Sequence, residues 1–187
     1  MSLPQALFSP PFAHRGLWRE DGPAENSLAA IAEAATEGYG VEFDVRLTAD
    51  GEVVVFHDAT FERMCGVKGA VGETLYAEMR KLRLKGGSDG IPTLKEVLNA
   101  INGRCLPLIA LQTVPGEEGP LEERVTALLD HYHHPFAVIG FNAQSHAWFA
   151  RHRPKFARGL DGERLADDVL AQTTLDLAYI FDGQVLL

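Results

Sequence analysis

The stretch VEFDVRLTADGEVVVFHD, residues Val41–Asp58, combines a strand pattern with closely spaced ionisable side chains. Apolar and polar residues alternate over its first eight positions, which is typical of a β-strand with one buried face. Asp50-Gly51 follows, and an Asp-Gly pair between two apolar runs is a strong signal for a β-hairpin. The second apolar run leads directly into His57-Asp58. The stretch therefore predicts two antiparallel strands with ionisable groups at their ends.

The alternation also predicts which side chains share a face of the first strand. Successive strand residues point to opposite faces, so Glu42 and Asp44 lie together on the polar face. A two-residue loop at Asp50-Gly51 would place Asp44 opposite His57, where facing side chains are about 5 Å apart at Cβ. A bulge in either strand would change this register. We expect two carboxylates and one imidazole to converge on a single patch.

The composition restricts the classes of protein and partner to be considered. The chain has 187 residues, 46% of them hydrophobic, which indicates one globular domain over residues 1–187. Its formal net charge of -9 argues against nucleic acid or an anionic membrane as the main partner, but leaves a small anionic substrate open. Cys65 and Cys105 have no ligand-like spacing, so we expect two unpaired thiols in a reducing compartment.

The N-terminal residues MSLPQALFSPPF contain no basic region and no long apolar run. They therefore lack the pattern of a signal peptide. No stretch of the sequence is long and apolar enough to span a bilayer. We expect a cytoplasmic protein that does not insert into the membrane.

Strand patterns alternate with helical patterns along the chain, which predicts a parallel α/β fold. Potential caps mark two helix starts: Asn26 or Ser27 precedes one pattern, and a capping box begins at Thr93. The strands expected besides the hairpin are Phe12–His14, Leu106–Leu111, Phe136–Phe141, Ala157–Leu160 and Leu177–Phe181. The helices expected besides the one that follows Thr93 are 26–38, Glu73–Leu84, Leu121–Tyr132, Ser145–His152 and Glu163–Gln172.

A second group of ionisable residues, in the motif AHRG, stands at the end of the first expected strand. An imidazole titrates near neutral pH and can move protons, so His14 and His57 can form an acid/base pair. The guanidinium fork of Arg15 suits a phosphate group. Carboxylates such as Glu42 and Asp44 suit a hard cation, Mg²⁺ or Ca²⁺. These residue types are compatible with cation-assisted chemistry on a phosphate ester.

Five motifs follow one another along the chain: HRG (His14–Gly16), AENS (Ala24–Ser27), EFDVRLTADGEVVVFHD (Glu42–Asp58), IPTLKEVL (Ile91–Leu98) and GFN (Gly140–Asn142). In their order and spacing they resemble the glycerophosphodiester phosphodiesterase family. The resemblance implies a TIM barrel. It also implies metal-assisted hydrolysis of a glycerophosphodiester to glycerol 3-phosphate and an alcohol.

The resemblance further implies roles for individual residues. His14 and His57 would be the catalytic acid/base pair, and Arg15 would bind the substrate phosphate. Glu42 and Asp44 would bind a divalent cation, Mg²⁺ or Ca²⁺. Which histidine donates a proton and which accepts one stays open, as does the nucleophile, either water or a neighbouring glycerol hydroxyl.

Two carboxylates next to these motifs are expected to support the site. Asp58 follows His57 directly, and we expect it to support the loop or orient the imidazole rather than bind the cation. Glu25 precedes a helix, so a capping role and a contact with the site both stay open.

The chain departs from the family pattern at several positions. Ala110 stands where the family has a third carboxylate ligand, and Gln112 stands where it has a lysine. Ala24 replaces a proline, which we interpret as a modest loop change. Glu117 and Glu118 follow closely and offer substitute ligands, although an acidic pair in a loop rich in Gly and Pro is usually just solvated.

The number of strands is a further departure. A complete (β/α)8 barrel usually needs about 250 residues. We therefore expect an incomplete TIM-barrel-type parallel barrel with about six of its eight strands. Because proteins usually cover open sheet edges, we also expect a homodimer or a higher oligomer.

Two functions stay open from the sequence. The first is a metal-dependent phosphodiester hydrolase of lipid metabolism, since Mg²⁺ often uses only one or two carboxylates together with substrate phosphate. The alternative is a non-catalytic relative that binds a phosphodiester or polyol phosphate through Arg15 and the histidines. The residues at positions 110 and 112 favour this alternative.

Overall fold

The computed structural model describes residues 11–85, 87–161, 177–179 and 185–186. Its strands are β1 (Phe12–His14), β2 (Gly40–Leu47), β3 (Val53–Val55), β4 (Pro107–Leu111), β5 (Ala137–Gly140), β6 (Ala157–Asp161), β7 (Leu177–Tyr179) and β8 (Val185–Leu186). Its helices are α1 (Leu28–Thr36), α2 (Glu62–Cys65), α3 (Tyr76–Met79), α4 (Leu94–Ile101), α5 (Pro120–Leu129) and α6 (Ala143–His152), with a short 3-10 helix at Val71–Glu73. The helix expected over Glu163–Gln172 lies outside the described residues.

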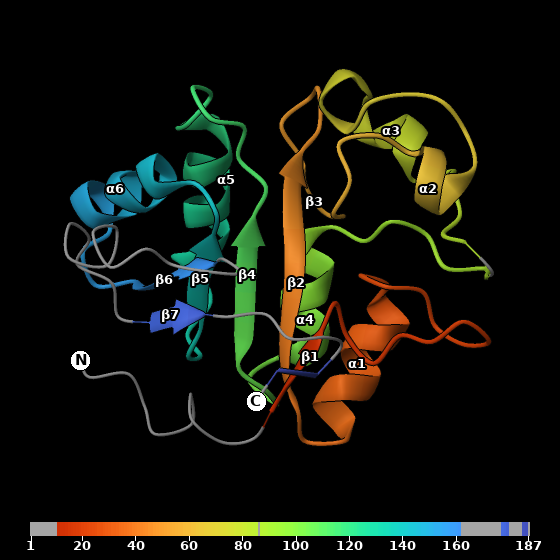
Figure 1. Ribbon diagram of the computed structural model, residues 1–187, viewed down its shortest axis with the longest axis horizontal. Helices are drawn as coiled ribbons and strands as arrows, with labels where there is room; N and C mark the ends of the chain where they lie inside the picture. The colour runs from red at the N-terminus through yellow and green to blue at the C-terminus, as the bar shows by residue number, and fades with distance from the viewer. Residues whose placement is uncertain (1–10, 86, 162–176, 180–184, 187) are drawn as a thin grey trace.

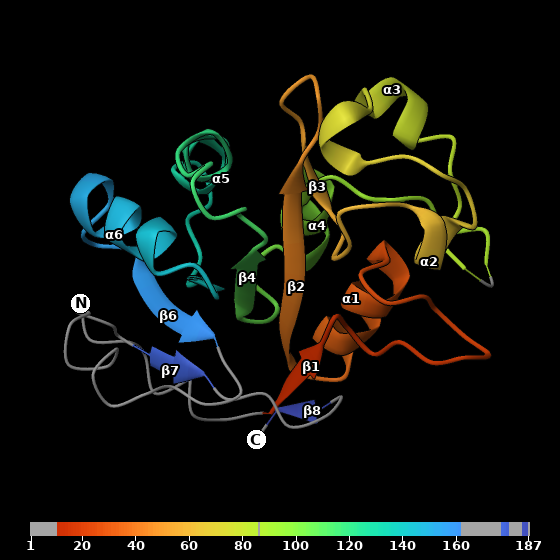
Figure 2. The same ribbon diagram turned by 45° about the horizontal axis from the view of Figure 1, so that its top comes forward.

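The strands form one sheet in the order β7-β6-β5-β4-β2-β1-β8, and β3 pairs with β2 outside this order. Strands β1, β2, β4, β5, β6 and β7 pair in parallel, which confirms the expected parallel α/β fold with about six barrel strands. Helices α1, α4, α5 and α6 lie along the outside of the curved sheet (Figures 1 and 2). Strand β8 pairs antiparallel with β1, so the β1 edge has a partner within this chain.

The register of the β2–β3 hairpin differs from the predicted one. The backbone N–H of Phe56 donates to the Asp44 carbonyl at 3.0 Å, so Asp44 faces Phe56 and not His57. The connecting loop contains residues 49–51, one more than predicted, and Gly51 closes it with φ of 79°. The prediction that Asp44 lies opposite His57 is therefore wrong, because a left-handed glycine allows the longer loop and moves the register by one residue.

The alternation along β2 places apolar and polar side chains on opposite faces of the sheet, as predicted. Val41, Phe43 and Val45 are fully buried in the main hydrophobic core, together with residues of α1 and α4. Glu42 and Asp44 point to the inner face of the sheet, where each is only 3% exposed. A small apolar cluster lies on this inner face: Phe12, Leu108, Ala110, Ala137 and Ile139. Two carboxylates buried beside apolar side chains need polar partners, which the neighbouring loops supply.

The predicted caps begin two of the outer helices. Ser27 caps α1, because its Oγ accepts a hydrogen bond from the Ala30 N–H at 3.1 Å. Thr93 and Glu96 form the predicted capping box at the start of α4. No helix in the described ranges is long and apolar enough to cross a membrane.

The continuous helix expected over Glu73–Leu84 is wrong. This segment forms only the end of the 3-10 helix and the four-residue helix α3. Met79 and Leu84 are both buried in a small core of their own, and the Leu84 N–H donates to the Asp89 carbonyl at 2.8 Å. Burying both side chains requires the chain to turn after α3, so tertiary packing overrides the helical pattern.

The segment between β3 and α4 forms a separate lobe beside the barrel strands, and it contains α2 and α3 (Figure 1). Its apolar core consists of Ala24, Val54, Phe56, Phe61, Met64, Val71, Met79, Leu84 and Ile91. Because Ala24 comes from the loop after β1 and Val54 from β3, the lobe is packed against both segments. Arg63 of α2 accordingly contacts Glu25 in the loop after β1.

Candidate active site

Strand β1 brings His14 and Arg15 to the end of the sheet where the C-terminal ends of the parallel strands meet. In the parallel pairing of β1 with β2, His14 is the partner of Glu42. The Arg15 N–H donates to the Glu42 carbonyl at 2.9 Å and to Glu42 Oε2 at 3.1 Å. The HRG motif and the carboxylates of β2, which are far apart in the sequence, therefore lie side by side.

The turn that follows Arg15 has an unusual backbone. Arg15 and Asn26 have φ of 59° and 58°, and the Asn26 N–H donates to the Arg15 carbonyl at 2.9 Å. Gly16 has φ of 83°, and a Cβ at this position would lie 2.7 Å from the carbonyl carbon of Ala30 in α1. A left-handed conformation costs a non-glycine residue on the order of 1 kcal/mol or more. Strain of this kind, concentrated in one turn, indicates a functional site.

Asp44 is the centre of the polar contacts. Its Oδ2 accepts a hydrogen bond from Asn26 Nδ2 at 2.8 Å and lies 3.2 Å from Arg15 Nε. Its Oδ1 accepts a hydrogen bond from Gln112 Nε2 at 2.7 Å. Because Ser27 caps α1, the side chain of Asn26 is available for this contact.

Glu42 and His14 lie next to each other, with Glu42 Oε2 and His14 Nε2 3.8 Å apart. Burial, and then the charge of Arg15, lower the pKa of His14 to about 4. The imidazole of His14 is therefore neutral at pH 7 in the protein alone. The charge of His57 also lowers this pKa, although to the smallest extent.

His57 follows the hairpin and is held by Asp58, since His57 Nδ1 and Asp58 Oδ1 lie 2.7 Å apart. Hydrogen bonds from Arg63, and to a lesser extent from His57, lower the pKa of Asp58 to about 2 although partial burial opposes the charge. An ionised carboxylate can only accept hydrogen bonds, so His57 Nδ1 has the proton. In the neutral ring Nε2 is then the acceptor.

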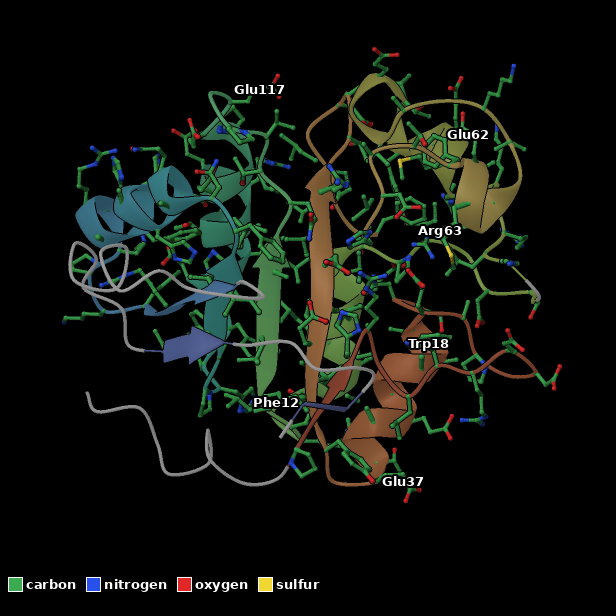
Figure 3. All side chains as sticks on the ribbon, in the orientation of Figure 1. Phe12, Trp18, Glu37, Glu62, Arg63 and Glu117 are labelled. Atoms are coloured by element: carbon green, nitrogen blue, oxygen red, sulfur yellow. The ribbon has the colours of Figure 1, made fainter. Side chains whose placement is uncertain are left out.

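Arg63 is a site residue that the sequence analysis did not identify. Its Nη2 and Nη1 donate to Glu25 Oε1 and Oε2 at 2.6 and 2.9 Å, and its Nε donates to Asp58 Oδ2 at 2.6 Å. Figure 3 shows Arg63 on the side of α2 that faces the loop after β1. The available signal was a basic residue on the short segment after the His-Asp motif, but the four-residue helix α2 gives no periodic pattern from which to place it.

Glu25, whose role stayed open between cap and site, contacts the site. Its Oε1 accepts a hydrogen bond from Arg15 Nη1 at 2.9 Å, besides those from Arg63. Burial opposes the charge of Glu25, but the hydrogen bonds and charges of Arg63 and Arg15 lower its pKa. Glu25 is therefore ionised between two guanidinium groups.

The opposite side of the site, at β4, has fewer charges. Ala110 pairs with Asp44 across β2 and β4 and is 1% exposed, so a methyl group occupies the position beside this carboxylate. Gln112 contacts Asp44 with an uncharged amide, and its carbonyl accepts a hydrogen bond from Arg46 Nη1 at 3.4 Å. Arg46 Nε also donates to the His57 carbonyl at 2.6 Å. Both departures from the family pattern therefore lie in the site itself.

The acidic pair after β4 has other partners. Glu118 Oε1 accepts hydrogen bonds from Asn142 Nδ2 at 2.7 Å and from the Gly116 N–H at 3.0 Å. Glu117 is exposed at the tip of the loop between β4 and α5 (Figure 3). Glu118 thus links this loop to the GFN motif after β5, and these contacts give no support to the pair as substitute cation ligands.

Glu42 and Asp44 are the oxygen donors that suit a divalent cation. They lie two residues apart on β2 and face the same way, and Asp44 Oδ1 accepts one hydrogen bond, which leaves it able to bind a further ligand. Within the ranges that the structure describes, no group of three or more His, Cys, Asp or Glu side chains is arranged to hold a metal ion. The donors present therefore fit a cation that takes its remaining ligands from water and substrate phosphate, as Mg²⁺ does.

Two bacterial proteins are similar to this chain in sequence. Protein YqiK of Bacillus subtilis (strain 168) is 32% identical over 179 residues, which cover 90% of this chain and 71% of that protein. A glycerophosphodiester phosphodiesterase of Bacillus altitudinis is 31% identical over 134 residues, which cover 65% of this chain and 52% of that protein. The chain therefore spans about half the length of the second relative.

The fold is similar to solved structures. A phosphodiesterase of Oleispira antarctica, solved in complex with the product sn-glycerol-3-phosphate, matches with a TM-score of 0.81 and 27% identity over 89% of this chain and 71% of that one. The six parallel strands and outer helices are accordingly those of an incomplete TIM barrel. The model of the Glycerophosphoryl diester phosphodiesterase family matches residues 14–147, which include the site on β1 and β2. Because this match covers more than half of the chain and the Bacillus altitudinis relative agrees with it, the chain belongs to the glycerophosphoryl diester phosphodiesterase family.

Proposed function

We propose that this chain hydrolyses a glycerophosphodiester to glycerol 3-phosphate and an alcohol. The observation that supports this most is that His14, Arg15, Glu42 and Asp44 contact one another at the C-terminal ends of β1 and β2, where barrels of this type have their sites. Polar contacts through Asp58, Arg63 and Glu25 connect His57 to Arg15 of this group. Similarity to a phosphodiesterase solved with sn-glycerol-3-phosphate supports the choice of substrate.

Arg15 is the side chain that we assign to the substrate phosphate. Glu25 holds its Nη1 at 2.9 Å, and its buried Nε lies 3.2 Å from Asp44 Oδ2 without completing a hydrogen bond. None of the described residues accepts a hydrogen bond from Nη2. A guanidinium group held in this way can present its remaining donors to phosphate oxygens.

His14 and His57 are the residues that we assign to proton transfer. One would take a proton from the nucleophile, either water or a neighbouring glycerol hydroxyl, and the other would protonate the leaving alkoxide. His57 is prepared for this task, because Asp58 fixes the Nδ1–H tautomer and stabilises the ring when it becomes protonated.

Glu42 and Asp44 are the residues that we assign to a divalent cation, Mg²⁺ or Ca²⁺. When bound, the cation would neutralise negative charge that develops on the phosphoryl oxygens. Asp44 also has a role in the chain's own structure, since it holds the side chain of Asn26 and lies beside Arg15. The same carboxylate thus serves both the cation and the phosphate ligand.

A second function is favoured by the β4 side of the site. Ala110 and Gln112 remove a carboxylate and a positive charge relative to the family pattern, and both lie against Asp44. A chain with this site could bind a phosphodiester or a polyol phosphate without hydrolysing it. Binding and turnover must therefore be measured separately.

The decisive experiment measures release of glycerol 3-phosphate from sn-glycero-3-phosphocholine with Mg²⁺, with Ca²⁺ and with a chelator. Turnover should require a cation and should fall at least 100-fold in His14→Gln and in His57→Gln. The matched control is His152→Gln, because His152 is exposed on α6, where its Nδ1 contacts the Trp148 carbonyl and its ring stacks on the Trp148 ring. Calorimetric binding of glycerol 3-phosphate without turnover under any of these conditions would establish the non-catalytic function instead.

A further inference from the structure

Arg63 connects two parts of the site that belong to different segments of the chain. Its guanidinium group donates two hydrogen bonds to Glu25, at 2.6 and 2.9 Å, and two to Asp58, at 2.6 and 2.9 Å. Glu25 lies in the loop after β1 and Asp58 follows the β2–β3 hairpin. All three guanidinium nitrogens are therefore used by two carboxylates.

Each of these carboxylates holds one of the residues assigned to the reaction. Asp58 Oδ1 lies 2.7 Å from His57 Nδ1, and Glu25 Oε1 lies 2.9 Å from Arg15 Nη1. A continuous series of polar contacts thus runs from His57 through Asp58, Arg63 and Glu25 to Arg15. One guanidinium group is shared by the proton-transfer end and the phosphate-binding end of the site.

We propose that Arg63 is a positioning residue that fixes His57 and Arg15 relative to each other through Asp58 and Glu25. This inference rests on the proposed function, since it concerns the same site. Arg63 acts only through the two carboxylates: it orients groups that contact the substrate.

The backbone of α2 is anchored without the help of these ion pairs. Met64, the next residue, is buried in the core of the lobe, and Gly66 ends the helix with φ of 68°. The side chain of Arg63 can therefore be exchanged while the helix keeps its place. A guanidinium group is required here, because its planar fork can satisfy two carboxylates at once, whereas a lysine offers a single point charge.

Glu25 and Asp58 share one guanidinium group, and the two carboxylates are buried more deeply than this group. Glu25 and Asp58 have 10% and 19% exposed side chains, and Arg63 is 46% exposed, so the carboxylates are more deeply placed than the cation that joins them. Without Arg63, Glu25 would keep only Arg15, and Asp58 would keep only His57. Asp58 would then lose the two hydrogen bonds that fix its orientation, so it would no longer select a single tautomer of His57.

The experiment compares Arg63→Gln with Arg153→Gln. Arg153 also makes a two-bond ion pair through Nε and Nη2, to Asp130 at 3.1 and 2.7 Å, but it follows α6 away from the site. For Arg63→Gln we expect kcat to fall and KM for sn-glycero-3-phosphocholine to rise, with kcat/KM reduced on the order of 10- to 100-fold, as for other residues that orient catalytic groups. Arg153→Gln should leave both constants unchanged.

Two readouts do not depend on turnover. Nitrogen-15 spectra of the histidine rings, with His57 assigned from the His57→Gln variant, should show the Nδ1–H tautomer in the wild type and a mixture of tautomers in Arg63→Gln. Calorimetry should show weaker binding of glycerol 3-phosphate in Arg63→Gln but not in Arg153→Gln. If the wild type has no activity, the proposed function fails, while these readouts still test the role of Arg63.

A third variant covers the case in which Arg63→Gln does not fold. Arg63→Lys keeps the positive charge and loses the fork, so its kcat/KM should lie between those of Arg63→Gln and the wild type. Unchanged tautomer, unchanged glycerol 3-phosphate affinity and unchanged kinetic constants in a folded Arg63→Gln, or in Arg63→Lys if only that variant folds, would overturn the proposal.

Discussion

The two sides of the site provide different kinds of side chain. The β1–β2 side, which we define as residues 14–63, contains both histidines, both carboxylates of β2, Arg15 and the Glu25–Arg63–Asp58 contacts. The β4–β5 side, residues 107–142, contributes Ala110, the uncharged amide of Gln112 and a Glu118–Asn142 contact. The charged side chains assigned to the reaction therefore all come from the β1–β2 side.

This difference separates two requirements of the proposed reaction. Orientation of the proton-transfer and phosphate-binding groups depends mainly on the β1–β2 side, where contacts through Asp58, Arg63 and Glu25 link His57 to Arg15. Affinity for a cation depends on the number of carboxylates that both sides provide. A chain can thus keep the first property while the second is weakened, and the following variants test whether the two sides are unequal in this way.

The largest effect is expected when the charge of Asp44, which accepts a hydrogen bond from Gln112 of the other side, is removed. Asp44→Asn removes a proposed cation ligand and the counter-charge beside Arg15, so we expect kcat/KM to fall about 1,000-fold, which corresponds to roughly 4 kcal/mol. Gln112→Ala removes the same Oδ1–Nε2 hydrogen bond from its neutral end, and we expect a loss of about tenfold or less. Steady-state kinetics of both variants, with thermal melts to verify folding, provide the comparison. Equal losses would mean that the two sides contribute alike.

Packing against α1 should constrain the HRG turn, on the β1–β2 side, more than its positive φ alone. Gly16→Ala introduces a Cβ that lies 2.7 Å from the backbone of Ala30 at a φ of 83°, so we expect a loss of about 3 kcal/mol in the free energy of unfolding. Gly38→Ala is the matched control, because Gly38 has a φ of 81° and no atom within 4 Å of the added Cβ. We expect only about 1 kcal/mol there. Urea unfolding measures both, and equal losses would show that φ alone, and not the contact with α1, constrains the HRG turn.

The sequence predicted the β1–β2 side well because its information is local. Alternation placed Glu42 and Asp44 on one face of β2, and the parallel pairing of β1 then brought His14 beside Glu42. The hairpin register was wrong by one residue, since an Asp-Gly pair does not fix the length of the loop. His57 is nevertheless connected to Arg15, through contacts of Asp58, Arg63 and Glu25 that do not require it to face Asp44.

Contacts between distant segments could not be predicted in the same way. Arg63 lies on a helix of four residues, too short to show periodicity, and its partners come from two other segments. The helix expected over Glu73–Leu84 failed for a related reason, since the second apolar core that bends this segment involves residues as distant as Ala24 and Ile91. Local patterns predict elements, whereas the packing of the lobe decides which side chains reach the site.

A carboxylate added to the β4–β5 side should make the two sides more equal. Ala110→Glu places a third acidic group beside Asp44, so we expect Mg²⁺ or Ca²⁺ to bind about tenfold more tightly in calorimetry, about 1.4 kcal/mol. Ala110→Gln is the control, because it has the same length without the charge. If both variants bind the cation as the wild type does, position 110 does not contribute to the cation site.

The smallest effect concerns the pH dependence of stability on the β1–β2 side. The pKa of Asp58 is lowered to about 2 by Arg63 and His57, compared with about 3.9 in an unfolded chain. A carboxyl group with a lowered pKa stabilises the fold fully above its unfolded pKa and loses that contribution as the pH falls towards its folded pKa. Because Arg63 is partly exposed and screened, we expect Asp58→Asn to cost about 1 kcal/mol at pH 6. This difference from the wild type should disappear between pH 4 and pH 2.

The control for this last variant is Asp130→Asn, which disrupts the exposed pair with Arg153. Hydrogen bonds from Arg153 lower the pKa of Asp130 too, but both side chains are 39% exposed, so the loss of stability should be smaller than for Asp58→Asn at pH 6. Urea unfolding at pH 6, pH 4 and pH 2.5 measures both variants. A difference between Asp58→Asn and the wild type that stays constant over this range would show that the contact with Arg63 does not depend on the charge of Asp58. The Asp58–Arg63 contact would then orient His57 without a contribution from the charge of Asp58.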